Sequence, residues 1–173
     1  MDSARLEQAS QIIEQDSPTR FSLLVIKNGR LVFERYYRNS RATDANNIKS
    51  MSKSILSILT GIALDEGLPR STDQKLHEFF PEYFRPGGDP RKLEVTLAHL
   101  LTVTAGFEWG ENTEISERCF SSGDWHRFVI ESPLTSAPGE VFNYSTGFTH
   151  LVSGVLTRAS GMSTSAFAVD GGC

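Results

Sequence analysis

The chain has 173 residues, of which 39% are hydrophobic and 22% are charged, a composition typical of a folded domain with a hydrophobic core. Its 17 Lys and Arg residues and 21 Asp and Glu residues give a net charge of −4, without a basic run or a basic stripe interleaved with aromatic residues. These features exclude a disordered chain and disfavour nucleic acid as the partner. No segment approaches the roughly 20 apolar residues of a membrane span, so no membrane partner is expected.

Residues 1–15 have the pattern of an amphipathic helix and lack the continuous apolar stretch of a signal peptide, which predicts a cytoplasmic location. The two cysteines, Cys119 and Cys173, belong to no CxxC pair and indicate no disulfide framework. Metal-ligand spacing is absent among the four histidines, which are His77, His99, His126 and His150. We therefore expect no zinc site.

Residues 21–26 and 31–37 are β-rich runs, and the Asn28-Gly29 pair between them is a strong hairpin signal. The apolar run 23–26 indicates burial on both faces, so we expect something to pack against each face of this sheet. One face is expected to carry Leu23, Val25, Leu31 and Phe33.

After a polar connector at 39–49, the sequence predicts mostly helices. The first begins near residue 50 and ends before Gly67, and its apolar residues surround most of the circumference, which indicates a central helix. Further helices are expected after Thr96, over 124–131, and from about 146 to 161.

For residues 107–123 the sequence predicts a loop or a weak helix. Paired carboxylates for acid–base work are conceivable there, but a solvated acidic face is favoured for Glu108, Glu111, Glu114 and Glu117.

The run Ser50-Met51-Ser52-Lys53 reads as an SxxK motif at the start of that first helix. Residues three positions apart share a helix face, so Lys53 can accept the proton that makes the Ser50 hydroxyl a nucleophile. The first helical turn also offers unpaired N–H groups that favour an oxyanion. The alternative is an N-capping Ser50 with a solvated Lys53, which is the better interpretation if no other motif matches.

Tyr144 lies between a Pro138-Gly139 turn and the last long helix, where its hydroxyl can project into a cleft; the alternative is an ordinary half-buried tyrosine. Together Ser50, Lys53 and Tyr144 resemble the penicillin-binding and class C β-lactamase-related serine hydrolases, whose first two motifs are SxxK and YxN. The resemblance extends in order and spacing from about Phe21 to Phe167. Its blocks are 50–55, 61–67, 79–82, 96–106 and 138–145. Residues 107–109 and the Tyr-Ser-Thr variant are more similar to the esterase and 6-aminohexanoate-oligomer hydrolase branch.

The resemblance implies a β-lactamase/transpeptidase-like α+β fold. It implies a single, incomplete domain over residues 1–173, with a helix and an antiparallel β-hairpin of the sheet in 1–49. The mostly helical part, which carries SxxK and YxT, is expected in 50–173.

The resemblance also makes Ser50 the acylated nucleophile, Lys53 its proton acceptor, and Tyr144 the relay that serves the leaving group and the deacylating water. Lysine and tyrosine both have reference pKa values of about 10, so such a pair acts at neutral pH by sharing one mobile proton. No GxSxG nucleophile elbow occurs, which leaves a Ser-His-Asp site without support.

Two departures from the family pattern limit this interpretation. Thr146 stands where YxN has Asn, so an amide that donates and accepts becomes a hydroxyl with a single donor, which argues against efficient β-lactam hydrolysis. The third motif, Lys or His followed by Thr or Ser and then Gly, is absent, and the expected helix is abandoned at 169–173. We therefore expect a chain truncated at its C-terminus, without the remaining strands of the sheet and with weak or no activity.

The function that the resemblance implies is that of a serine hydrolase acting through an acyl-enzyme on a small ester or amide, without a metal or an organic cofactor. The alternatives are a non-catalytic truncated remnant or binding module of the same fold, and a DD-peptidase, which needs export. Thr146 and Trp109 are candidates for substrate binding, although core packing is the favoured interpretation of Trp109.

Overall fold

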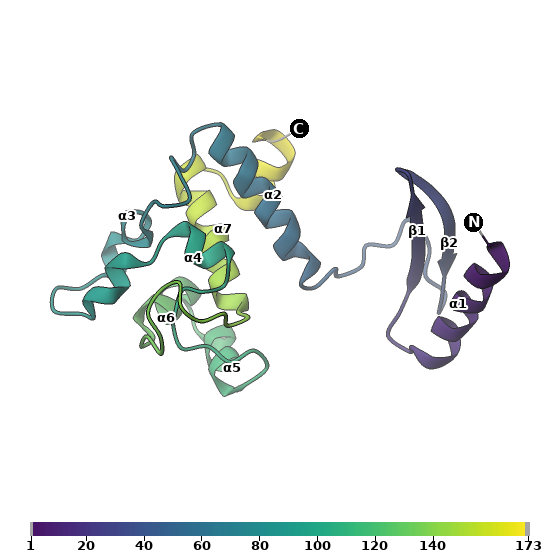
Figure 1. Ribbon diagram of the computed structural model, residues 1–173, viewed down its shortest axis with the longest axis horizontal. Coiled ribbons are helices and arrows are strands. Elements are labelled where there is room, and N and C mark those ends of the chain that lie inside the picture. Colours follow the sequence, from purple (N-terminus) through teal and green to yellow (C-terminus); the bar gives the residue numbers. More distant parts are fainter. Residues whose placement is uncertain (1, 172–173) are drawn as a thin grey trace. The chain divides into compact units, whose positions relative to one another are not determined.

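The computed structural model describes residues 2–171, with strands near the N-terminus and helices elsewhere (Figure 1). The chain divides into two units, one ending at Ile48 and the other beginning at Lys49. Helices together with a two-stranded sheet confirm the predicted α+β class. The predicted single, incomplete domain stays a prediction. In the described part of the chain, no helix is long and apolar enough to cross a membrane.

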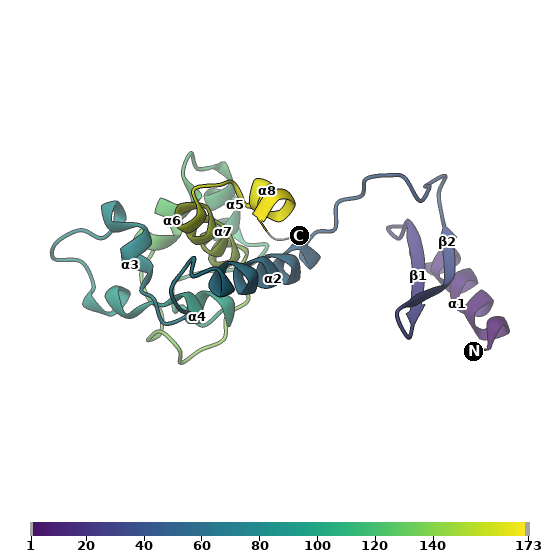
Figure 2. The ribbon, with the colours of Figure 1, turned by 90° about the horizontal axis from the view of Figure 1, so that it is seen from above.

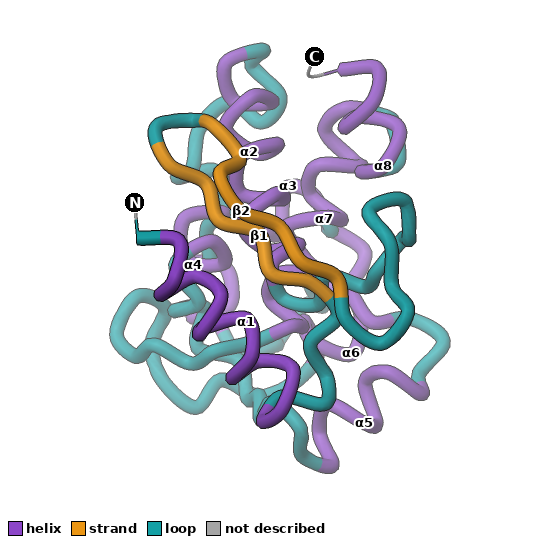
Figure 3. Tube along the Cα trace, turned by 90° about the vertical axis from the view of Figure 1, so that its right-hand side faces the viewer, coloured by secondary structure: helices purple, strands orange, loops and turns teal. Residues whose placement is uncertain are grey.

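The N-terminal unit consists of helix α1 (Ser3–Asp16) and a hairpin of strands β1 (Ser22–Lys27) and β2 (Arg30–Tyr36), seen together in Figure 3. The strands are antiparallel, as predicted. Asn28 and Gly29 have φ angles of 51° and 72°, the left-handed pair that a two-residue type I′ turn requires.

A β-bulge interrupts the regular alternation of this hairpin. Val25 pairs with Phe33, whereas the next residue, Ile26, pairs with Leu31, so Val32 is the extra residue. Adjacent residues of β1 point to opposite faces, and therefore Leu31 and Phe33 do too. The prediction that these two side chains share a face is wrong because the inserted residue shifts the alternation.

Side-chain contacts hold helix α1 against one face of the hairpin. Arg35, which pairs with Leu23 across the strands, forms an ion pair with Glu7 of α1, and the hydroxyls of Tyr37 and Ser10 lie 2.9 Å apart. The other face carries Leu24, Ile26 and Leu31, which are 50%, 68% and 50% exposed. Within residues 2–48, helix α1 therefore covers only one face of the hairpin, and the other face is left exposed.

Helix α7 (Thr146–Ser160) is the centre of the second unit (Figures 1 and 2). It contacts α2 (Met51–Asp65), α3 (Leu76–Phe79), α4 (Leu97–Leu101) and α6 (Trp125–Glu131). Its apolar residues Phe148, Leu151, Val155 and Leu156 are at most 1% exposed. The remaining short elements are η1 (Pro81–Tyr83), η2 (Pro90–Glu94), α5 (Glu114–Ser121), α8 (Thr164–Ala166) and η3 (Phe167–Gly171).

Helix α2 buries only one side among the described residues. Leu56 and Leu59 are 8% exposed, whereas Met51, Ile55 and Ile58 are 68%, 46% and 65% exposed. The central position that the sequence indicates for α2 therefore belongs to α7 in the structure.

Caps define several helix ends as the sequence predicts. The Thr96 hydroxyl accepts from the His99 N–H, and the Asp124 carboxylate accepts from the Arg127 N–H. Gly161 ends α7 with a left-handed φ of 73°. Cys119 is a free, buried cysteine, and Cys173 lies outside the described residues.

Two glycines let the neighbours of α7 approach its backbone. A Cβ atom at Gly147 would lie 2.6 Å from Cζ3 of Trp109 and 2.8 Å from Cγ2 of Val129. A Cβ atom at Gly154 would lie 2.4 Å from Nε2 of His126. Side chains at these positions would therefore push α7 away from the elements around it.

We expect Gly147→Ala to destabilise the chain by about 1–3 kcal/mol, because the added methyl group overpacks a rigid indole ring. Gly61→Ala is the matched control, since Gly61 is also inside a helix but has open space around it. That control is expected to stabilise by about 0.5–1 kcal/mol through helix propensity. Urea unfolding measures both free energies, and equal effects of the two substitutions would contradict the packing argument.

An aromatic cluster joins α6 to α7. The rings of His126 and His150 stack with centroids 4.5 Å apart, and Trp125 lies 4.9 Å from His150. Burial, and then the neighbouring His126, lower the pKa of His150 to about 4. Both imidazoles are therefore neutral when the chain is folded at neutral pH, since burial also lowers the pKa of His126.

This cluster predicts a loss of stability in mild acid. Between about pH 6.5 and pH 4 an unfolded histidine binds a proton that folded His150 does not, so the free energy of unfolding falls as the pH is lowered through this window. After allowance for partial exposure, the expected loss is about 2 kcal/mol. His150→Gln should flatten this part of the curve in urea unfolding at a series of pH values; an unchanged slope would refute the assignment.

Candidate active site

Ser50 directly precedes helix α2, and its side chain makes no capping hydrogen bond. Lys53, one turn further along, places its Nζ atom 3.2 Å from Ser50 Oγ. Ser50 is exposed while Lys53 is partly buried. The hydroxyl is thus open to solvent on one side and within hydrogen-bonding reach of an amine on the other, as proton transfer between the two requires.

Lys53 also connects α2 to the start of α7. Its Nζ atom lies 3.1 Å from Oγ1 of Thr146, the first residue of α7, although the two residues are 93 positions apart. The same atom lies 5.2 Å from the centre of the Tyr144 ring. The Tyr144 side chain therefore meets Lys53 through its ring face, and Tyr144 is 42% exposed.

The predicted site residues Ser50, Lys53, Tyr144 and Thr146 are therefore close together. The hydroxyl of Tyr144 has no hydrogen-bond partner within residues 2–171.

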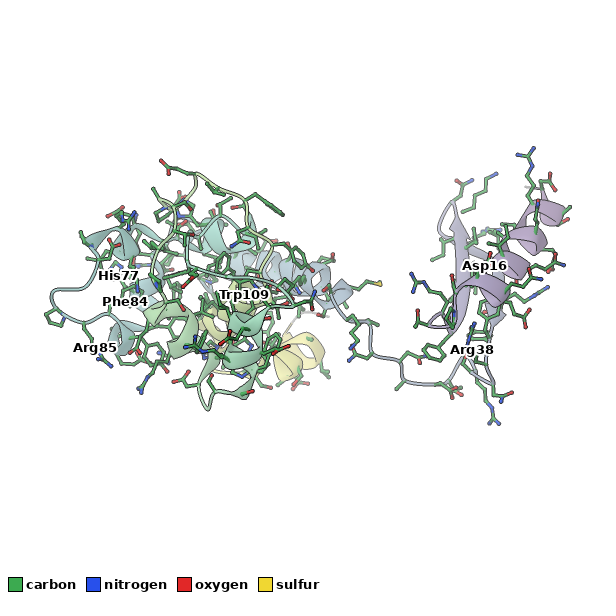
Figure 4. All side chains as sticks on the ribbon, turned by 90° about the horizontal axis from the view of Figure 1, so that it is seen from below. Asp16, Arg38, His77, Phe84, Arg85 and Trp109 are labelled. Atoms are coloured by element: carbon green, nitrogen blue, oxygen red, sulfur yellow. The ribbon has the colours of Figure 1, made fainter. Side chains whose placement is uncertain are left out.

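Trp109 lies inside the helical unit, as Figure 4 shows, and is 7% exposed. Its Nε1–H donates to a carboxylate oxygen of Glu111 at 2.7 Å. The same carboxylate accepts from the backbone N–H of Thr146 at 2.9 Å and from the Thr146 hydroxyl. Trp109 therefore reaches the candidate site through Glu111.

Glu111 is the site residue that the sequence does not reveal, since its surroundings favour a solvated acidic face. Burial opposes ionisation, yet the hydrogen bonds from Thr146 and Trp109 and the charge of Lys53 leave the pKa of Glu111 below its usual value. The residues around it have no hydrophobic period, and its main partner is 35 positions away. No local pattern could have identified this contact.

Lys53 lies between two hollows of the surface. The first, about 160 Å³, is mainly apolar and is lined by Leu100, Val103 and Tyr144 among others. The second, about 260 Å³, is lined by Trp125, Thr146 and His150 among others. A larger hollow, about 700 Å³, lies beside the 85–90 loop and is lined by none of the candidate residues.

The cluster combines a free hydroxyl, an amine and a carboxylate, which suits proton transfer and nucleophilic attack. Among the described residues, no group of three or more His, Cys, Asp or Glu side chains is placed to hold a metal ion.

Solved structures share this fold. A Bacillus anthracis protein with the provisional name 6-aminohexanoate-dimer hydrolase matches 88% of this chain with a TM-score of 0.71 and 17% identity. EstCE1, a hydrolase with promiscuous acyltransferase activity, matches 92% with a TM-score of 0.71 and 18% identity. The octameric penicillin-binding protein homologue from Pyrococcus abyssi matches 98% with a TM-score of 0.66 and 24% identity.

This chain spans less than half the length of each of these structures, 42%, 47% and 42% respectively. A family model described as Beta-lactamase matches residues 13–170, which is most of the chain. On this match, and with the fold that it shares with these hydrolases, the chain belongs to the beta-lactamase family.

Proposed function

We propose that this chain carries the acylation site of a serine hydrolase that acts on a small ester or amide. The observation that carries the proposal is the 3.2 Å separation of Lys53 Nζ and Ser50 Oγ at the start of α2, without a competing cap bond from Ser50. Family membership supports hydrolysis as the reaction class.

In the proposed acylation step, the neutral Lys53 amine takes the Ser50 proton while Ser50 Oγ forms a bond to the substrate carbonyl carbon. Negative charge passes to the carbonyl oxygen, near the positive end of the α2 dipole. As the oxyanion collapses, the bond to the leaving group breaks, and the proton on Lys53 passes to the leaving group through the Tyr144 hydroxyl. The product is an ester between the acyl group and Ser50.

In the proposed deacylation, water attacks the acyl carbon, and its proton passes through the Tyr144 hydroxyl to Lys53. As this second oxyanion collapses, the bond between the acyl carbon and Ser50 Oγ breaks, and Ser50 takes the proton back from Lys53. We assign Tyr144 to this step and to the leaving group, because its hydroxyl is exposed and without a partner among the described residues. The Tyr144 ring also lies beside the same amine, with Lys53 Nζ 5.2 Å from the ring centre, which supports this assignment.

A second candidate is a non-catalytic form of the same fold. It is considered because the 173 residues contain no Lys/His-Thr/Ser-Gly motif. Losing one oxyanion donor typically costs about 100- to 1000-fold in turnover. Because turnover can be low even if Ser50 is a working nucleophile, covalent labelling of Ser50 distinguishes the two candidates better than turnover does. The cytoplasmic location stays a prediction.

We expect a fluorophosphonate probe to label Ser50, as located by peptide mapping, and Ser50→Ala to abolish this label. Lys53→Met should slow labelling by about 100- to 10 000-fold, because a positioned base contributes that much. Ser54→Ala is the matched control, since Ser54 is an exposed serine of the same helix. A folded chain that is not labelled at Ser50, or a Lys53→Met variant labelled at the wild-type rate, would refute the proposal.

A further inference from the structure

Glu111 and Thr146 form a hydrogen-bonded pair behind Lys53. The Glu111 carboxylate accepts from the N–H and the hydroxyl of Thr146, and also from the Trp109 indole. Glu111 is partly buried and Trp109 is 7% exposed, so water has little access to this side of the pair. Both carboxylate oxygens are thereby held in place.

The direction of each hydrogen bond follows from the charge of Glu111. Its lowered pKa means that it is a carboxylate at neutral pH, and a carboxylate only accepts hydrogen bonds. The short contact between the two side chains therefore uses the single hydroxyl proton of Thr146. What remains on Thr146 Oγ1 is acceptor capacity.

Lys53 supplies the donor for that acceptor. Its Nζ atom lies 3.1 Å from Thr146 Oγ1 and 3.2 Å from Ser50 Oγ. When the amine is neutral, one N–H directed to Thr146 restricts its rotation, and the lone pair is left free to face Ser50. A Thr146 hydroxyl that could turn would instead donate to this lone pair and compete with Ser50 for it.

We propose that Glu111 is a positioning residue which, through the Thr146 hydroxyl, turns the Lys53 amine toward Ser50. This inference rests on the proposed function of Ser50 and Lys53. A base held by a third group is the general design of activated nucleophiles, and here a carboxylate and a hydroxyl together take the orienting role. Thr146 then faces a substrate as an acceptor only.

The first experiment measures the rate of fluorophosphonate labelling of Ser50 in the full chain. Glu111→Gln and Thr146→Val should each slow labelling by about 10- to 100-fold, the cost of a misplaced catalytic group. The double variant should be no slower than the slower single variant, because both substitutions break one chain of contacts. Thr146→Ser keeps the hydroxyl and should restore most of the rate.

Glu117→Gln is the matched control, since Glu117 is an exposed glutamate of the neighbouring helix α5 and should label at the wild-type rate. Equal labelling of Glu111→Gln and the wild type would overturn the inference. So would effects of Glu111→Gln and Thr146→Val that simply multiply in the double variant.

The second experiment does not depend on catalysis. A double-mutant cycle of unfolding free energies from urea unfolding, with Glu111→Gln and Lys53→Met, should be non-additive. The non-additivity should become smaller in Thr146→Val, where only the direct charge interaction between Glu111 and Lys53 remains. An additive cycle overturns the inference whether or not the chain is labelled. An unlabelled wild-type chain with a non-additive cycle would instead refute the proposed function and retain the coupling of Glu111 to Lys53 through Thr146.

Discussion

The hydrogen bond from Lys53 to Thr146 joins the two helices on which the candidate site depends. Its two ends are 93 residues apart, so it exists only because α2 and α7 pack together. That packing rests on the burial of α7, whose apolar residues meet elements on several sides. The absence of a Cβ at Gly147 lets Trp109 approach the first turn of α7, which is the turn that carries Thr146. The contact of Trp109 with Gly147 therefore contributes both to the packing of the core and to the geometry of the candidate site.

Most of the local structure could be predicted from the sequence, because it is decided by neighbouring residues. Asn28-Gly29 determines the hairpin turn through left-handed φ angles that few other residues adopt readily. Thr96 and Asp124 begin their helices through side-chain oxygens three residues from the N–H groups that they accept from. The bulge at Val32 was missed because an inserted residue leaves a run of apolar residues unchanged in composition.

The residues of the candidate site also differ in whether the sequence could predict them. Ser50 and Lys53 could be found because one helical turn separates them, and Tyr144 because its motif and the family resemblance point to it. Glu111 could not, since its surroundings in the sequence are polar and irregular and its partners come from α7 and from Trp109. A carboxylate in a loop has the same local appearance whether it faces solvent or lies against a helix N-terminus. Only the tertiary packing distinguishes the two.

The contact with Glu111 explains how the Thr146 hydroxyl is oriented at the position where the related motif has Asn. An asparagine amide donates through its nitrogen and accepts through its oxygen, so it can do both at once through different atoms. A threonine hydroxyl has one proton and rotates, and its orientation has to be set by a neighbour. The carboxylate of Glu111 accepts a hydrogen bond from this hydroxyl and another from the backbone N–H of Thr146. Thr146 and Glu111 therefore act as one unit, and an amide at position 146 would leave the Glu111 carboxylate facing a different set of donors.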